Sequence, residues 1–168
     1  MKSYYIINRY EIGPIYINFL LEEFMNSSSN ISKEYSLLTS ELDSIYHEAA
    51  FKLGVSDSAM WIMYALGQKG GSCSLRDIVI LSGISKQTIN SAVRKMESEE
   101  ILYLENIDAR RKNVCLTEKG KALAARSSYI VMQMEEDIFK SWSKEDAELL
   151  IRFTKQFVND LTTRVRRL

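Results

Sequence analysis

Hydrophobic residues recur at steps of three and four along most of the chain, and this period predicts a mainly helical fold. The clearest early example is the apolar face formed by Tyr35, Leu38, Leu42, Ile45 and Ala49. This helix is expected to end at Gly54, and Ser56 is expected to cap a following helix with its body over 59–66. A shorter amphipathic helix is expected over 15–25, where Pro14 suits the first turn.

The middle of the chain predicts two short helices joined by a tight turn. Ser74 is placed to cap a helix over 75–81, and Ser85 to cap a second helix that runs to about Ser98. Three residues join the two helices, with Gly83 at their centre. Two helices of this length joined by a short turn containing glycine are typical of the helix-turn-helix.

A β-hairpin is expected directly after the second of these helices. Residues 101–105 and 113–117 have the composition of strands, and a polar, basic loop over 106–112 separates them. A hairpin in this place is a wing. Thr117 then caps a long helix over 118–140, and a last helix, opened by Ser143, runs to about 164. The predicted fold is therefore mainly α with a small β-wing.

One face of the second helix has the chemistry of a surface that reads DNA. Ile89, Ala92, Val93 and Met96 lie at helical spacing and form its buried side. Asparagine and glutamine can pair with adenine in the major groove, and lysine and arginine with guanine. The residues expected to face the major groove are Ser85, Lys86, Gln87, Thr88, Asn90, Ser91 and Arg94. The alternative is a plain solvated helix face, which the neighbouring short helix and hairpin disfavour.

The wing tip carries three cations and one carboxylate, namely Asp108, Arg110, Arg111 and Lys112. A narrow minor groove attracts inserted arginine because its negative potential is concentrated there. Asp108 is placed to orient one arginine through a charge-assisted hydrogen bond. The alternative is that these charges only keep the hairpin tip in solution.

The chain resembles the MarR family of transcriptional regulators. The resemblance rests on 85–101 and on the pattern Asp108-x-Arg110-x-x-x-Val114-x-Leu116-Thr117-x-x-Gly120. It covers about 33–165 and implies a homodimer whose two winged helix-turn-helix domains enter successive major grooves. It also implies that Arg110 enters the minor groove. Glu100 and Leu104 depart from the pattern, because a glycine and a basic residue are common at these two places.

The resemblance implies a division into three parts. N-terminal helices over 1–55 and C-terminal helices over 122–168 are expected to dimerise, and 56–121 to form the DNA-binding domain. Candidate interface residues lie on both sides of this domain: Leu38, Leu42, Ile45, Tyr46, Leu149, Leu150, Phe153, Phe157 and Leu161. The alternative is that these faces complete the core of one chain.

Many proteins of this family respond to small phenolic or lipophilic ligands. The candidate lining of such an effector pocket is Tyr46, Met60, Trp61 and Tyr64. Aromatic residues at helical spacing are more often part of a core, and that alternative stays open. The expected partners are therefore double-stranded DNA, a second copy of the chain and a small aromatic or lipophilic effector.

The net charge of the 168 residues is zero, which does not by itself favour DNA binding. The charge is unevenly distributed, however. Residues 1–60 carry 4 basic and 8 acidic groups, whereas 74–121 carry 9 basic and 7 acidic groups. The basic excess thus lies in the helix-turn-helix and wing.

Composition also bears on where the protein works. No stretch approaches the roughly 20 apolar residues that span a bilayer, and the N-terminus does not have the pattern of a secretory signal. Only Cys73 and Cys115 are present, which favours the reduced cytoplasm and makes a redox switch a minor alternative. No membrane partner is expected.

Catalysis and metal sensing are not expected. His47 is the only histidine, and the sequence contains no nucleophile-elbow or phosphate-loop motif. No cofactor is expected either. The sequence predicts a ligand-responsive repressor that binds a pseudo-palindromic operator as a dimer. The alternative is a winged-helix adaptor that binds protein and not DNA.

Overall fold

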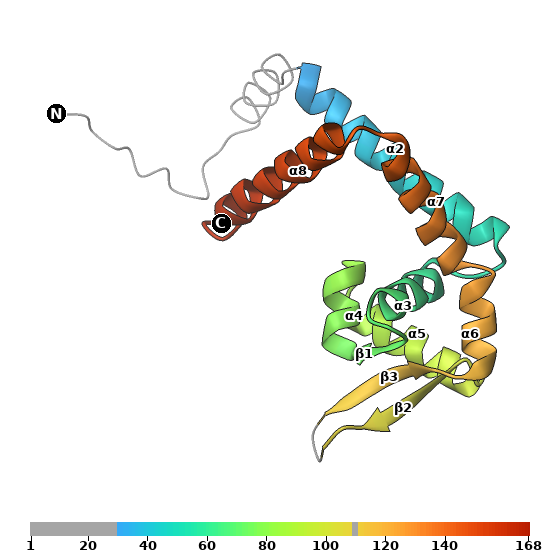
Figure 1. Ribbon diagram of the computed structural model, residues 1–168. Helices are drawn as coiled ribbons and strands as arrows, with labels where there is room; N and C mark the ends of the chain where they lie inside the picture. Colours follow the sequence, from blue (N-terminus) through green and yellow to red (C-terminus); the bar gives the residue numbers. More distant parts are fainter. Residues whose placement is uncertain (1–29, 109–110) are drawn as a thin grey trace, which may run out of the picture. The chain divides into compact units, whose positions relative to one another are not determined.

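The computed structural model describes residues 30–108 and 111–168 (Figure 1). The predicted helix over 15–25 lies outside the described residues. The chain divides into two units, up to Ile45 and from Tyr46 onward, and the boundary falls within the first described helix. The elements are α2 (Asn30–Lys52), α3 (Asp57–Gln68), β1 (Ser72–Ser74), α4 (Leu75–Ser82), α5 (Lys86–Ser98), β2 (Leu102–Asn106), β3 (Lys112–Leu116), α6 (Glu118–Ala125), α7 (Ser128–Ser141) and α8 (Lys144–Val165).

Five predicted helix caps are confirmed. In each, the side-chain oxygen of a serine or threonine accepts a hydrogen bond from the backbone N–H three residues later, which satisfies a donor that the first turn leaves unpaired. The capping residues are Ser56, Ser74, Ser85, Thr117 and Ser143. These caps set where α3, α4, α5, α6 and α8 begin.

A three-stranded antiparallel sheet in the order β1-β3-β2 supports the helices. The two predicted wing strands are confirmed within one residue at each end. The first strand, β1, is not among the elements that the hydrophobic pattern predicts. Its three residues pair with β3, so that Ser72 lies opposite Cys115 and Ser74 opposite Asn113. A strand this short has too little alternation to be recognised in a sequence.

The main core lies between the sheet and α3, α4, α5 and α6. Ile62 and Leu66 of α3, Ile78 of α4 and Ile89 of α5 are completely buried in it. Figure 1 shows α3, α4 and α5 gathered together, with the β2–β3 hairpin projecting from them. This packing joins α5 and the strands of the wing to one core.

The long helix expected over 118–140 is interrupted, and this expectation was wrong. α6 ends at Ala125 and α7 begins at Ser128. Ser127 is completely buried with φ −137° and ψ −95°, and its Oγ donates to the Leu123 carbonyl oxygen at 2.7 Å. Such a bond to a carbonyl of the preceding turn bends helices. The break lets Ala124 enter the main core while Val131 joins a second cluster with Met60.

The last helix, α8, buries none of its side chains. Its apolar residues are about half exposed, including Phe153 at 55% and Leu161 at 49%. No helix among the described residues is long and apolar enough to cross a membrane.

Candidate nucleic-acid interface

The recognition helix predicted from the sequence is α5, and its two faces differ as expected. Ile89, Val93 and Met96 are buried in the main core. Gly83, with φ 66°, ends α4 in the left-handed conformation and turns the chain into α5. The predicted reading residues Ser85, Lys86, Gln87, Thr88, Ser91 and Arg94 are exposed, and Asn90 is half-buried.

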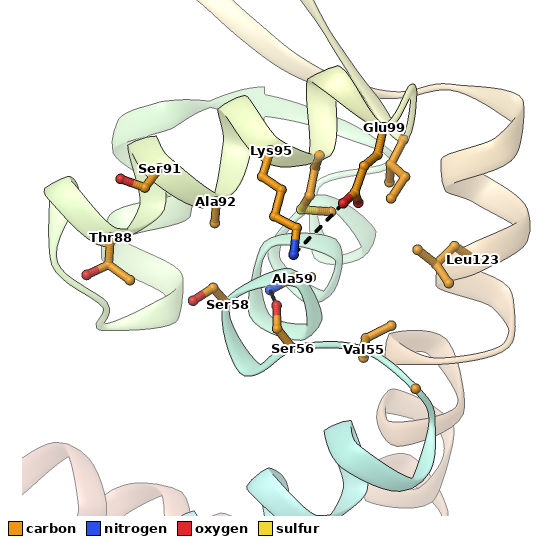
Figure 2. A pocket seen from close by; sticks show the side chains of 13 residues that line it. Val55, Ser56, Ser58, Ala59, Thr88, Ser91, Ala92, Lys95, Glu99 and Leu123 are labelled. Carbon is orange, nitrogen blue, oxygen red and sulfur yellow. Dashed lines mark hydrogen bonds and ion pairs between the residues drawn. The ribbon is translucent and has the colours of Figure 1, made fainter.

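Thr88 and Ser91 also lie on the rim of a cleft between α5 and the start of α3. The cleft has a volume of about 520 Å³, and Figure 2 shows Ser58 and Ala59 on its other side. Ser85 Oγ lies 2.9 Å from Thr88 Oγ1, so this hydroxyl is partly occupied within the helix cap. Lys86, Gln87 and Arg94 do not line the cleft and are exposed on α5.

The end of α5 is closed by a Schellman turn. The Ile101 N–H donates to the Met96 carbonyl at 2.8 Å, and the Glu100 N–H donates to the Glu97 carbonyl at 3.0 Å. Glu100 has φ 57°, the only positive φ of a non-glycine residue in the described parts of the chain. Glu100 therefore stands where a glycine is common in the family, and its backbone adopts the left-handed conformation that glycine favours.

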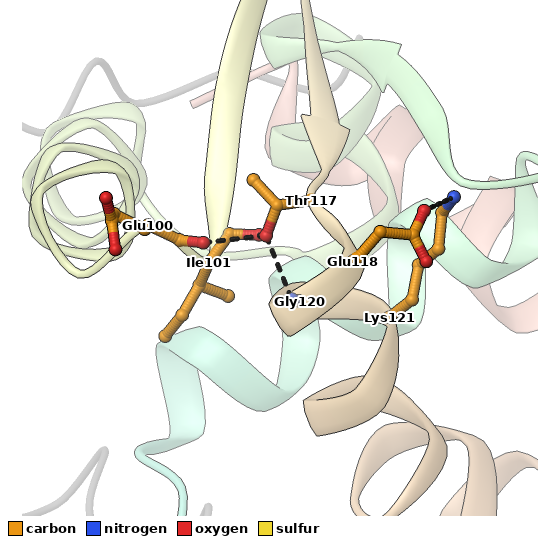
Figure 3. A network of polar contacts seen from close by, with 6 residues as sticks. All are labelled: Glu100, Ile101, Thr117, Glu118, Gly120 and Lys121. Carbon is orange, nitrogen blue, oxygen red and sulfur yellow. Dashed lines mark hydrogen bonds and ion pairs between the residues drawn. The ribbon is translucent and has the colours of Figure 1, made fainter.

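The Thr117-x-x-Gly120 part of the wing motif ties α6 to the end of α5 (Figure 3). Thr117 Oγ1 accepts from the Gly120 N–H at 3.0 Å and donates to the Glu100 carbonyl at 2.6 Å. A Cβ at Gly120 would lie 2.0 Å from the Ile101 carbonyl oxygen. Glycine is required at this position because a backbone carbonyl occupies the place of a side chain.

The wing tip holds an ion pair between Asp108 and Arg111. The Arg111 Nε donates to Asp108 Oδ2 at 2.5 Å, and its backbone N–H donates to Oδ1 at 2.8 Å. Lys112 is exposed at the start of β3. Arg110, the arginine singled out by the motif, lies outside the described residues. Asp108 thus orients an arginine of the tip, as the sequence suggested, and the arginine is Arg111.

The four candidate effector residues come together between α2, α3 and α7. The Trp61 ring lies 5.1 Å from the Tyr46 ring and 5.3 Å from the Tyr64 ring, centroid to centroid. Met60 is buried in the same cluster. The side chains of Tyr46, Trp61 and Tyr64 are half-buried.

Sequence reasoning missed Glu135 of α7, which joins this cluster. The hydroxyls of Tyr46 and Tyr64 donate to its two carboxylate oxygens. Burial raises the pKa of both phenols, the neighbouring carboxylate raises it further, and the pKa of Tyr64 reaches about 12. The signal in the sequence was weak, because Glu135 is followed by two further acidic residues on an amphipathic helix.

The two cysteines occupy neighbouring strands but differ by one position in register. Cys73 lies opposite Val114, while Cys115 lies opposite Ser72, so their side chains point to different faces of the sheet. Both thiols are free and buried. Burial raises the pKa of Cys73 to about 11, which makes it unreactive at neutral pH. Among the described residues, no group of three or more histidine, cysteine or carboxylate side chains is placed to hold a metal ion.

Comparisons with known proteins agree with this architecture. Residues 53–112 match the model of the MarR family. A comparison with curated proteins gave no match.

Three solved structures illustrate the similarity in fold. A MarR family regulator from Neisseria meningitidis has a TM-score of 0.72 at 15% identity, over 83% of this chain and 99% of that chain. The complex of MepR from Staphylococcus aureus with DNA has a TM-score of 0.60 at 18% identity, over 80% and 99%. Bordetella bronchiseptica BpsR, whose DNA binding is regulated by 6-hydroxynicotinic acid, has a TM-score of 0.56 at 17% identity, over 74% and 98%. Residues 53–112 are thus a MarR-family winged-helix segment, and the chain around them has the fold of MarR family regulators.

Proposed function

We propose that this protein is a regulator of transcription that binds double-stranded DNA at specific sequences and acts as a repressor. The observation that carries the proposal is the exposed polar face of α5, next to a wing whose arginine is oriented by Asp108. A surface that reads DNA needs polar side chains on a rigid helix and cations beside it. Such a regulator works in the cytoplasm, with the chromosome.

In the major groove, the amide of Gln87 is suited to adenine, and Lys86 and Arg94 are suited to guanine or to phosphate. All three side chains are exposed on α5, whose opposite face is fixed in the core. A fixed helix loses little conformational freedom on binding, which favours specific readout. Asn90, Ser85, Thr88 and Ser91 complete the proposed contact surface.

In the minor groove, the proposed contacts come from the wing. Arg111 is oriented by two hydrogen bonds to Asp108, and Lys112 extends the positive charge along β3. The motif assigns the deepest insertion to Arg110. Arginine is favoured there because the narrow groove concentrates negative potential.

The DNA-binding form is proposed to be a homodimer on a pseudo-palindromic operator. α8 has an apolar stripe and no buried side chain, and α2 exposes Leu38 at 57% and Leu42 at 50%. Stripes of this kind are covered in a stable assembly, and a two-fold dimer would present two α5 helices to half-sites about 34–36 Å apart.

We further propose that the Tyr46–Trp61–Tyr64 cluster responds to a small aromatic effector. The phenols share Glu135, so a ligand that separates them from this carboxylate alters how α2, α3 and α7 are connected. BpsR supplies a precedent within the fold, since 6-hydroxynicotinic acid regulates its DNA binding.

The test begins with selection of bound sequences from a random-sequence DNA pool, followed by binding titrations of the wild-type protein and Gln87→Ala. We expect a preferred sequence, steep weakening as salt rises, and loss of about 1–3 kcal/mol of discrimination at one base position in the variant. Gln133→Ala is the matched control, because Gln133 is an exposed amide on α7. A wild-type protein that selects no sequence and binds no DNA would favour the protein adaptor instead.

A further inference from the structure

A second cationic surface lies beside the reading helix, between the first turn of α4 and the wing. A groove of about 740 Å³ is lined from the α4 side by Ser74 and Arg76 and from the wing by Arg111, Lys112 and Asn113. Its charged lining consists of three cations and two carboxylates, Asp77 and Asp108. None of the proposed base-reading residues of α5 belongs to it.

The sheet explains why residues so distant in sequence meet here. Ser74, the cap of α4, lies directly opposite Asn113 in the β1–β3 pairing. Arg76 follows Ser74 by two residues, and Lys112 precedes Asn113. The register therefore brings the start of α4 to the base of the wing, and the two sides of the groove are held by backbone hydrogen bonds.

Among the described residues, both carboxylates of the groove have hydrogen-bond partners, whereas two of its cations form no ion pair. Asp77 accepts from Ser74 Oγ at 2.7 Å, and Asp108 is held by Arg111. In the described parts of the chain, neither Arg76 nor Lys112 lies within 4 Å of a carboxylate oxygen. A concave surface in which cations outnumber carboxylates, and in which Arg76 and Lys112 are not held in ion pairs with described residues, favours an anionic ligand.

We propose that this groove binds a phosphate of the DNA backbone, with Arg76 and Lys112 as its ligands. The inference rests on the proposed function. A protein that reads the major groove with α5 and the minor groove with its wing must straddle the strand of phosphates that separates the two grooves. The α4–wing groove is lined by the wing itself and by the start of α4, the helix that packs against α5, so a phosphodiester bound there fixes the register of the protein on DNA without reading sequence.

The experiment is a salt titration of binding to the selected DNA by the wild-type protein, Arg76→Ala, Arg76→Lys and Arg126→Ala. Arg126 is an exposed arginine between α6 and α7. Arg126→Ala is the control, because it removes the same charge at a position away from the groove. We expect Arg76→Ala to bind about tenfold more weakly to specific and random DNA alike, as for one lost charge-assisted hydrogen bond. The slope of log K against log salt should also fall by about 1.

Neutralising the DNA phosphates one at a time as methylphosphonates identifies the ligand. At one phosphate, neutralisation should weaken the wild-type protein but not Arg76→Ala, and Arg76→Lys should recover part of the lost affinity. If Arg76→Ala behaves like Arg126→Ala while the wild type binds DNA specifically, the α4–wing groove does not bind a phosphate, and the proposed function stands. If the wild type binds no DNA, the proposed function itself fails.

Discussion

Two residues at the junction of α5 and α6 show how single positions of the family motif are set by backbone geometry. Glu100 occupies the left-handed region at φ 57°, which costs a non-glycine residue about 1–2 kcal/mol. Gly120 sits against the Ile101 carbonyl, where a side chain has no room. At position 100 a side chain is tolerated at an energetic cost, whereas at position 120 a side chain is not tolerated.

At Glu100, glycine should stabilise the protein. Glu100→Gly removes the strain of the left-handed conformation, so we expect the free energy of unfolding to rise by about 1 kcal/mol in urea denaturation. Glu97→Gly removes the same charge from a helical position and should lower it by about 1 kcal/mol. A loss of stability in both variants would contradict the strain at Glu100.

At Gly120, even a methyl group should destabilise the fold. Alanine ordinarily favours a helix over glycine, but here its Cβ would meet the Ile101 carbonyl oxygen at 2.0 Å. We expect Gly120→Ala to lower the free energy of unfolding by about 3 kcal/mol, measured by urea denaturation. Ala122→Gly, on the exposed side of the same helix, should cost only about 1 kcal/mol.

Between elements, the carboxylate of Glu135 joins α2 and α3 to α7 through two phenols. A carboxylate accepts hydrogen bonds from neutral phenols only, so the connection depends on protonation of Tyr46 and Tyr64. Their pKa values are raised above the ordinary 10.0 in the folded protein. The neutral forms therefore stabilise the fold fully below pH 10, and this contribution is lost as pH rises through the folded pKa values.

Alkaline titration tests this connection. The wild-type free energy of unfolding should decline as pH rises from about 10 toward 12, the pKa of Tyr64. Tyr64→Phe removes one titrating hydroxyl and should decline less steeply over this range, although it starts lower at neutral pH. Equal slopes for the two proteins, measured by urea denaturation at each pH, would show that Tyr64 is not coupled to folding.

At the scale of the whole molecule, the exposed apolar stripe of α8 predicts association. Leu161→Asp places a charge within the stripe, and we expect it to convert the proposed homodimer into a monomer with its helices retained. Sedimentation and circular dichroism measure the two properties. Asn159→Asp changes the opposite side of α8 and should leave the dimer intact. A dimeric Leu161→Asp protein would exclude this face from the interface.

The local elements of this protein could be predicted from sequence because their signals are local. Ser56, Ser74, Ser85 and Thr117 begin helices through bonds that reach only three residues along the chain, and Gly83 turns the chain through its own φ. The buried face of α5 likewise follows from its period alone. The motif from Asp108 to Gly120 carried the resemblance to the MarR family, and this resemblance implied the overall fold.

Contacts between distant residues decided the rest. β1 is a strand only because β3 lies beside it, and Ser127 ends α6 because Ala124 and Val131 are required in different clusters. Glu135 meets Tyr46 and Tyr64 across 89 and 71 residues of sequence, and Arg76 meets the wing only through the sheet register. The sequence by itself thus determined where α3, α4, α5, α6 and α8 begin and which face of α5 is buried, because these depend on short-range bonds and periodicity. Only the tertiary structure determined which charges and phenols share a site, because that depends on how the elements pack.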